Sequence, residues 1–139
     1  AILADPPEVV DDALLALIFS YYDHSLKYLS KEMWRNAMAL AIEAPGTPNG
    51  RRYFEMDQRL AAQMSDLVAA LQDRGKVRSD IDPGLFGTLL FNNINQMFLE
   101  FVKEDDMPLN VLRSRVAAQI LPLAKLIATR SLAYTLSSE

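Results

Sequence analysis

The sequence predicts an all-α protein in which five helices form a single bundle. Apolar residues recur at spacings of three and four through most of the 139 residues, and no strand-like alternation of apolar and polar residues competes with that pattern. Residues that break helices divide the chain into five segments. Half of the residues are apolar, which is enough for one hydrophobic core at this length, so we treat residues 1–139 as a single domain.

The first predicted helix begins at the sequence DPPE and runs to about Leu29. Asp5 is suited to cap it, and Pro6 fits its first turn. Two of its faces are apolar: one carries Leu14, Leu17, Tyr21, His24 and Tyr28, and the other carries Leu15, Phe19, Tyr22, Leu26 and Leu29. A helix that is apolar on both sides needs neighbours all round, so we expect this helix to lie at the centre of the domain.

The second and third predicted helices are separated by a loop. Ser30 is a suitable cap for the second helix, which extends to about Glu43, and the sequence APGTPNG at 44–50 predicts the loop. The third helix then extends to Arg74, and Gly75 ends it. Its apolar residues follow a heptad-like spacing: Tyr53, Met56, Leu60, Met64, Leu67 and Leu71.

The fourth and fifth helices complete the predicted bundle. Asp82 followed by Pro83 is a start signal for the fourth helix, which runs to about Lys103. The sequence EDDMP then breaks the chain before a fifth helix, predicted from about Leu109 to Tyr134. Pro122 lies inside this helix and is expected to kink it or weaken its middle.

Composition argues against several classes of function. One His and no Cys cannot supply a zinc site, and no glycine-rich loop could hold a phosphate, so we predict no metal, no cofactor and no enzymatic activity. A formal charge of −4 disfavours a surface that grips nucleic acid. No apolar run approaches the roughly 18 residues of a membrane span, and we expect no membrane partner. The chain starts with Ala rather than Met, which indicates a fragment or a processed form.

Aromatic residues and methionines of the first three helices allow two interpretations. His24 is either a core histidine bonded to a neighbour or a polar group inside a ligand cavity. The same choice applies to Tyr21, Tyr28, Met33, Trp34, Met38, Tyr53, Met56 and Met64. Such residues most often form plain core. Adaptable methionines beside Tyr, Trp and His, which carry polar tips, also line apolar ligand pockets.

The sequence FNNINQMF at 91–98 places four amide side chains in an otherwise apolar helix. At 100° per residue these amides fall within an arc of about 160°, and leucines such as Leu89 share the arc. The opposite face of this helix is wholly apolar. An uncharged face of Leu and amides favours a protein–protein interface or a pocket wall, and a merely solvated face is the remaining alternative.

The fifth predicted helix carries an apolar stripe of its own, composed of Leu112, Val116, Ile120, Leu123 and Ile127. Further apolar residues lie off that stripe, such as Val111 and Leu126. The last two helices therefore have more apolar surface than one small core requires. This excess predicts a helix pair that dimerises, with a homodimer about a two-fold axis as the expected form.

Residues 67–102, LVAALQDRGKVRSDIDPGLFGTLLFNNINQMFLEFV, resemble the ligand-binding and dimerisation domain of TetR-family transcriptional regulators. The shared pattern is a helix ending in a turn like DRGKV, then SDIDP, a long apolar helix, an acidic break and a last helix. The five-helix layout extends the resemblance over about residues 8–130. The family's basic helix-turn-helix domain is absent from this chain, so the resemblance implies a regulatory domain that reaches DNA only through a missing N-terminal part.

The resemblance also implies two sites. In the family the last two helices of each subunit form a four-helix bundle across the dimer axis. Carried over to this chain, the interface would contain Leu89, Asn93, Gln96, Leu112, Val116, Ile120, Leu123 and Ile127. The family's cavity for an effector lies between the first four of these helices. Its walls here would contain Leu17, Tyr21, His24, Tyr28, Trp34, Met38, Met56, Leu60, Met64 and Asn92.

The resemblance therefore implies a cytoplasmic regulator, most simply a repressor, that a largely apolar small molecule controls through population shift. Two alternatives stay open. One is a free-standing helical carrier of an apolar small molecule, and the other is a structural dimerisation module without a ligand. A core packed to normal density, with no cavity of several hundred cubic ångströms, would favour the structural module.

Overall fold

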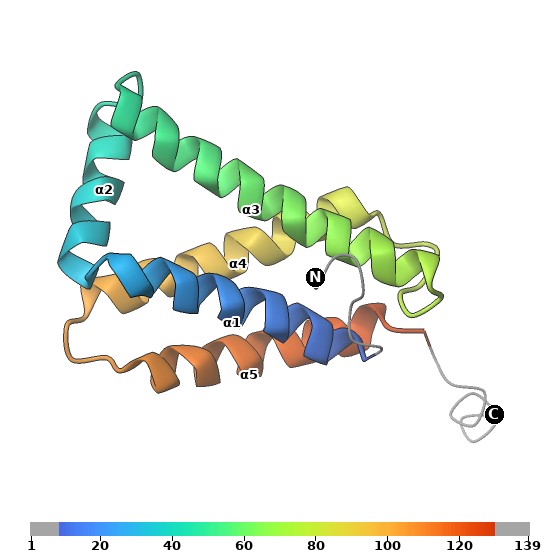
Figure 1. The fold of residues 1–139 in the computed structure, drawn as a ribbon. Coiled ribbons are helices and arrows are strands. Elements are labelled where there is room, and N and C mark those ends of the chain that lie inside the picture. Colours follow the sequence, from blue (N-terminus) through green and yellow to red (C-terminus); the bar gives the residue numbers. More distant parts are fainter. Residues whose placement is uncertain (1–8, 130–139) are drawn as a thin grey trace.

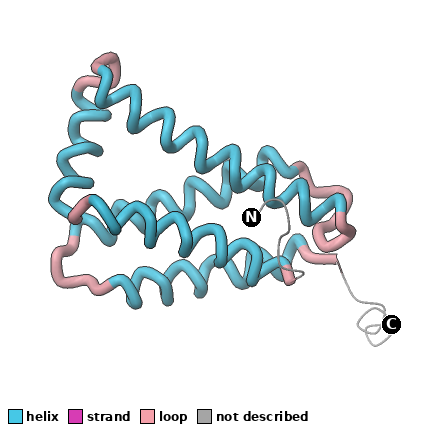
Figure 2. The backbone as a smooth tube through the Cα atoms, viewed as in Figure 1, coloured by secondary structure: helices cyan, strands magenta, loops and turns pink. Residues whose placement is uncertain are grey.

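The computed structural model describes residues 9–129 and contains five α-helices in this range, with no strand (Figures 1 and 2). The helices are α1 (Val10–Tyr28), α2 (Lys31–Glu43), α3 (Pro48–Asp73), α4 (Pro83–Lys103) and α5 (Leu109–Ile127). The prediction of an all-α chain with five helices is confirmed.

Three of the helix starts follow from capping side chains. The hydroxyls of Ser30 and Thr47 accept hydrogen bonds from the backbone N–H groups of Met33 and Gly50, three residues further on. The Asp82 carboxylate accepts from Gly84 and Leu85 at 2.9 and 3.2 Å. The predicted cap Asp5 lies outside the described residues, and α1 begins at Val10 without a side-chain cap.

Two predicted boundaries were wrong. Helix α3 begins at Pro48, inside the predicted loop, because Thr47 caps it and proline is favoured in a first turn. Helix α5 ends at Ile127, short of the predicted Tyr134, since the backbone of Ala128 pairs with Val77 in an isolated bridge after α3. Residues 130–134 of that prediction lie outside the described residues. Pro122 is accommodated within α5, which continues on both sides of it.

The contact between α3 and α4 sets the shape of the bundle. A Cβ at Gly87 of α4 would lie 2.6 Å from the Cα of Ser65 on α3, so only glycine permits this approach. From this contact the two helices diverge, and α2 spans the gap at the wide end (Figure 1). The three helices therefore form the sides of a triangle whose narrow corner lies at Gly87.

The core contradicts the prediction that the first helix is central. Leu14, Ile18 and Tyr22 on one side of α1 are buried, but His24 and Tyr28 are exposed to solvent. Helix α4 packs against α2, α3 and α5. Its buried residues are Gly87, Leu90, Phe91, Ile94, Met97, Phe98, Phe101 and Val102.

The apolar stripe of α5 was wrongly assigned to the dimer interface. Leu112, Val116, Ile120 and Ile127 are at most 1% exposed within a single chain. Helix α5 packs against α1 and α4, so these side chains belong to the core of the chain itself. A side chain without exposed surface has none to bury against a second copy. Leu123 is half-buried, and of the α4 candidates Leu89 and Gln96 are exposed and Asn93 is half-buried.

Candidate functional site

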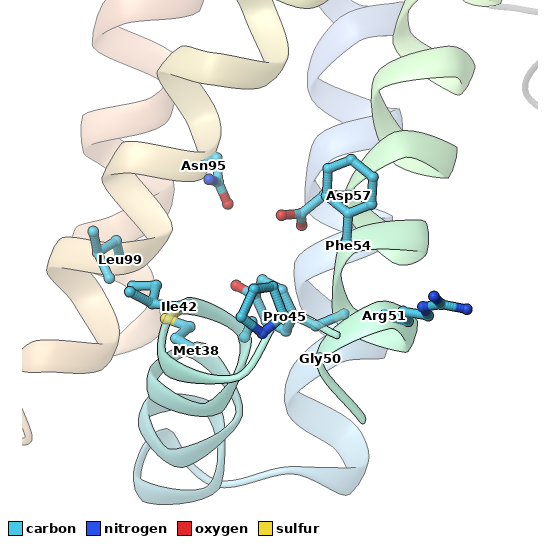
Figure 3. Close-up of a pocket in the computed structure, with 11 residues that line it drawn as sticks. Met38, Ile42, Pro45, Gly50, Arg51, Phe54, Asp57, Asn95 and Leu99 are labelled. Carbon is cyan, nitrogen blue, oxygen red and sulfur yellow. The ribbon is translucent and has the colours of Figure 1, made fainter. Parts of the chain in front are cut away.

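A cavity of about 460 Å³ occupies the wide end of the triangle formed by α2, α3 and α4 (Figure 3). We call it the α2–α4 cavity. Its lining comes from the second half of α2, the turn that follows, the first three turns of α3 and the second half of α4. The lining residues are Met38, Ala41, Ile42, Pro45, Gly50, Arg51, Tyr53, Phe54, Asp57, Asn95 and Leu99.

The first half of α2 is attached to the bundle by polar side-chain contacts. Lys31 Nζ donates to the carbonyl of Met107 at 2.6 Å, and Arg35 donates to the carbonyl of Val102 at 2.6 Å and to Asp105 at 2.8 Å. The hydrogen bond and charge of Arg35 lower the pKa of the exposed Asp105 carboxyl. These anchors hold the start of α2, whereas its second half forms the cavity wall.

A cluster of aromatic rings contacts Tyr53, which lines the cavity. The Trp34 indole stands edge-on to the rings of Tyr53 and Phe98, with centroids 6.2 and 5.6 Å away. Its Nε1 donates to the carbonyl of Ser25 at 3.0 Å, which fixes the indole between α1 and the cavity. Tyr53 is therefore held in position while one side of its ring faces the cavity.

Asp57 is the main polar feature of this lining. Its side chain points from α3 into the cavity, where Asn95 points toward it from α4 (Figure 3). Half-burial raises the pKa of the Asp57 carboxyl from 3.8 to about 6. Burial, followed by the nearby Asp57 charge, raises the pKa of Tyr53 far above its usual 10.0. Among the described residues, none forms a hydrogen bond or an ion pair with Asp57.

A second hollow of about 430 Å³ lies between α1 and α3, and we call it the α1–α3 groove. It is lined by Leu17, Ser20, Tyr21, His24, Met56, Arg59, Leu60 and Gln63. A small central gap of about 20 Å³ shares wall residues with both hollows. Tyr21 and Met56 also line the groove, and Asp57 also lines the cavity. The two hollows therefore approach each other through the bundle, with these side chains between them.

Seven of the ten ligand residues proposed from the sequence line one of these three spaces. Met38 lines the α2–α4 cavity, Trp34 lines the central gap, and Leu17, Tyr21, His24, Met56 and Leu60 line the α1–α3 groove. His24 is not a core histidine, because its side chain is exposed and lines the groove. Its ring contacts Tyr28 edge-on, with centroids 5.9 Å apart.

The other three proposed ligand residues line none of these three spaces. Tyr28 is 68% exposed near the end of α1 and lines none of these three spaces, and Met64 is fully buried in the core between the helices. Asn92 faces solvent, and the amide that lines the cavity is Asn95, one turn further along α4. The four amides span a wide arc, so the rotation of α4 about its axis decides which of them faces inward.

Comparisons of the chain with protein-family models, with curated proteins and with solved structures return no match. Within residues 9–129, no helix is long and apolar enough to cross a membrane. In the same range, no three His, Asp or Glu side chains are grouped so that they could hold a metal ion.

Sequence reasoning missed Asp57, although a signal was present. Residues 53, 57, 60, 64, 67 and 71 follow an alternating spacing of four and three along α3. Leu60, Met64, Leu67 and Leu71 of that series are buried. A carboxylate at a position of this series, where the pattern requires an apolar residue, indicates either a buried charge or a polar group in a cavity.

Proposed function

We propose that this chain is the effector-sensing and dimerisation domain of a cytoplasmic TetR-like transcriptional regulator, acting as a repressor. The α2–α4 cavity is the observation that carries the proposal. Its volume of about 460 Å³ lies within the range of sites for small molecules, and its lining is mostly apolar with a few polar groups. A bundle that served only to dimerise would have no need of such a space.

The contacts around the cavity supply a route from ligand to helix movement. A ligand between α2, α3 and α4 would press against Leu99 and Asn95 on α4. Helix α4 is joined to α1 by the Tyr22 hydroxyl, and α2 is joined to α1 by the Trp34 indole. In this proposal α1 leads to the DNA-binding domain, so two positions of α1 would correspond to two DNA affinities. The ligand must bind those two states with different affinity for any switching to occur.

The proposed homodimer uses the outer surfaces of α4 and α5. Leu85 and Leu89 on α4 are 72% and 50% exposed, and Leu126 on α5 is 63% exposed. Asn92 and Gln96 are also exposed on α4. Exposed leucines beside uncharged amides suit an interface in which the amides fix the register. The interface of the proposal is therefore this outer surface rather than the buried stripe of α5.

Binding of a neutral apolar fluorophore tests the ligand site. N-phenyl-1-naphthylamine should bind the wild-type chain, and Leu99→Trp should abolish binding because the indole occupies the cavity. Leu40→Trp is the matched control, since Leu40 lies on α2 outside the cavity lining. Equal binding to the wild type and to Leu99→Trp, or no binding to the wild type, would contradict the proposal.

A further inference from the structure

We propose that the α2–α4 cavity selects an apolar ligand that carries a positive charge, and that Asp57 is the residue that pairs with this charge. The inference rests on the proposed function, in which the cavity is an effector site. It adds the chemical class of the ligand and the residue that determines it.

The Asp57 carboxylate is costly to keep charged inside this mostly apolar lining. A carboxylate that points into a cavity lined by Phe54, Leu99 and Met38 gives up much of its hydration. No described residue forms a hydrogen bond or an ion pair with this carboxylate. A half-buried charge without a partner destabilises a fold. A ligand that supplies the opposite charge removes this penalty, and the free energy recovered contributes to its binding.

Among the described residues, no cationic side chain of the lining competes for Asp57. Of the described residues that line the cavity, Arg51 and Asp57 alone are charged. The Arg51 side chain is exposed and is directed away from the space into which Asp57 points (Figure 3). Arg59, on the same helix, lines the α1–α3 groove and not this cavity. The interior of the α2–α4 cavity is therefore negative, and an anionic ligand would meet a like charge.

The other lining residues are suited to a cation with an apolar body. Tyr53 and Phe54 offer aromatic rings to the cavity, and such rings attract cations through their faces. Asn95 adds an amide whose oxygen can accept a hydrogen bond from an ammonium group. The remaining lining is apolar, so it suits the hydrocarbon or aromatic body of the same ligand. Charge and shape together favour a lipophilic cation such as a bulky organic amine.

Two probes of the same shape and opposite charge test this selection. Tetraphenylphosphonium and tetraphenylborate can be titrated into the full chain by isothermal calorimetry. We expect the phosphonium to bind and the borate to bind at least about tenfold more weakly. Asp57→Asn should weaken phosphonium binding about tenfold and strengthen borate binding, whereas Asp57→Glu keeps the charge and should keep the preference.

Asp66→Asn is the matched control, because Asp66 is an exposed carboxylate on the same helix and lies outside the cavity lining. It should leave both affinities unchanged. Equal phosphonium affinity in the wild type and Asp57→Asn, or tighter binding of the borate to the wild type, would overturn the inference. In those cases binding of the neutral fluorophore, and its loss in Leu99→Trp, would still support an effector site of a different selectivity.

Discussion

The Tyr22 hydroxyl donates a buried 2.8 Å hydrogen bond to the backbone carbonyl of Ile94, and so joins α1 to α4 in the middle of the core. The same tyrosine ring stacks on Phe98, with centroids 5.3 Å apart and planes inclined by 19°. Ile94 lies one residue before Asn95, which lines the cavity. A movement of α4 caused by a ligand would therefore reach α1 directly through this contact.

Removing the hydroxyl should cost stability but leave the fold intact. Tyr22→Phe keeps the ring stacked on Phe98 and loses one buried hydrogen bond, and the Ile94 carbonyl keeps its place in the helix ladder. We expect the free energy of unfolding in urea to fall by about 1 kcal/mol. Tyr28→Phe, on the exposed end of the same helix, should change it little. An unchanged unfolding free energy for Tyr22→Phe would show that the contact contributes nothing.

The corner between α3 and α4 gives a second prediction. In Gly87→Ala the new Cβ would lie 2.6 Å from the backbone N and Cα of Ser65, so the helices must separate. We expect a loss of about 1–3 kcal/mol in unfolding free energy, as for overpacked cores. Gly84→Ala is the control on the same helix, since its Cβ would meet only the Asp82 side chain at an ordinary 3.4 Å. Equal stabilities of the two variants would contradict a tight corner at Gly87.

Asp57 gives a prediction about stability and pH. Because its pKa is raised from 3.8 to about 6 in the folded chain, the folded state binds the proton more tightly than the unfolded state. The stability that the neutral carboxyl confers is present below about pH 4 and is lost as the pH rises through 6. After allowance for solvent screening of this half-exposed group, the loss at pH 7.5 is about 1 kcal/mol.

Asp57→Asn should therefore be more stable than the wild type by about 1 kcal/mol at pH 7.5, and the difference should shrink toward zero at pH 4. Urea unfolding at the two pH values measures it. Asp66→Asn, which removes an exposed carboxylate from the same helix, should lie within about 0.5 kcal/mol of the wild type at pH 7.5. A wild type more stable than Asp57→Asn at pH 7.5 would mean that Asp57 has a stabilising partner.

The sequence predicted where the helices lie along the chain better than it predicted how each helix is rotated about its axis. Local sequence signals correctly predicted the caps at Ser30 and Asp82. They also predicted the helix end at Gly75, where φ is +74°. The start of α3 was missed because Pro48, which looked like part of a loop, lies in the first turn of the helix. The end of α5 was missed because Ala128 pairs with the backbone of Val77, which the helical pattern of the sequence does not reveal.

The candidate site shows the same limit. Several of the proposed methionines and aromatic residues, such as Met38, Tyr21 and Met56, line the hollows, since residues of this type lie on helix faces that the spacing defines. Asn92 was preferred to Asn95 because only tertiary packing fixes the rotation of α4. The α5 stripe was assigned to a dimer because the sequence does not reveal that α1 and α4 already cover it.

The outer leucines of α4 give the last prediction. If the proposed dimer buries Leu89, an arginine there would place two charges of the same sign near the two-fold axis and leave them without solvent. Light scattering at micromolar concentration should give about twice the 15.6 kDa of one chain for the wild type and about one chain mass for Leu89→Arg. Leu40→Arg is the control, because Leu40 is a partly exposed leucine on α2 and should leave the dimer intact. A monomeric wild type would remove the dimer from the proposal and favour a free-standing carrier, in which the cavity binds its ligand without a second copy.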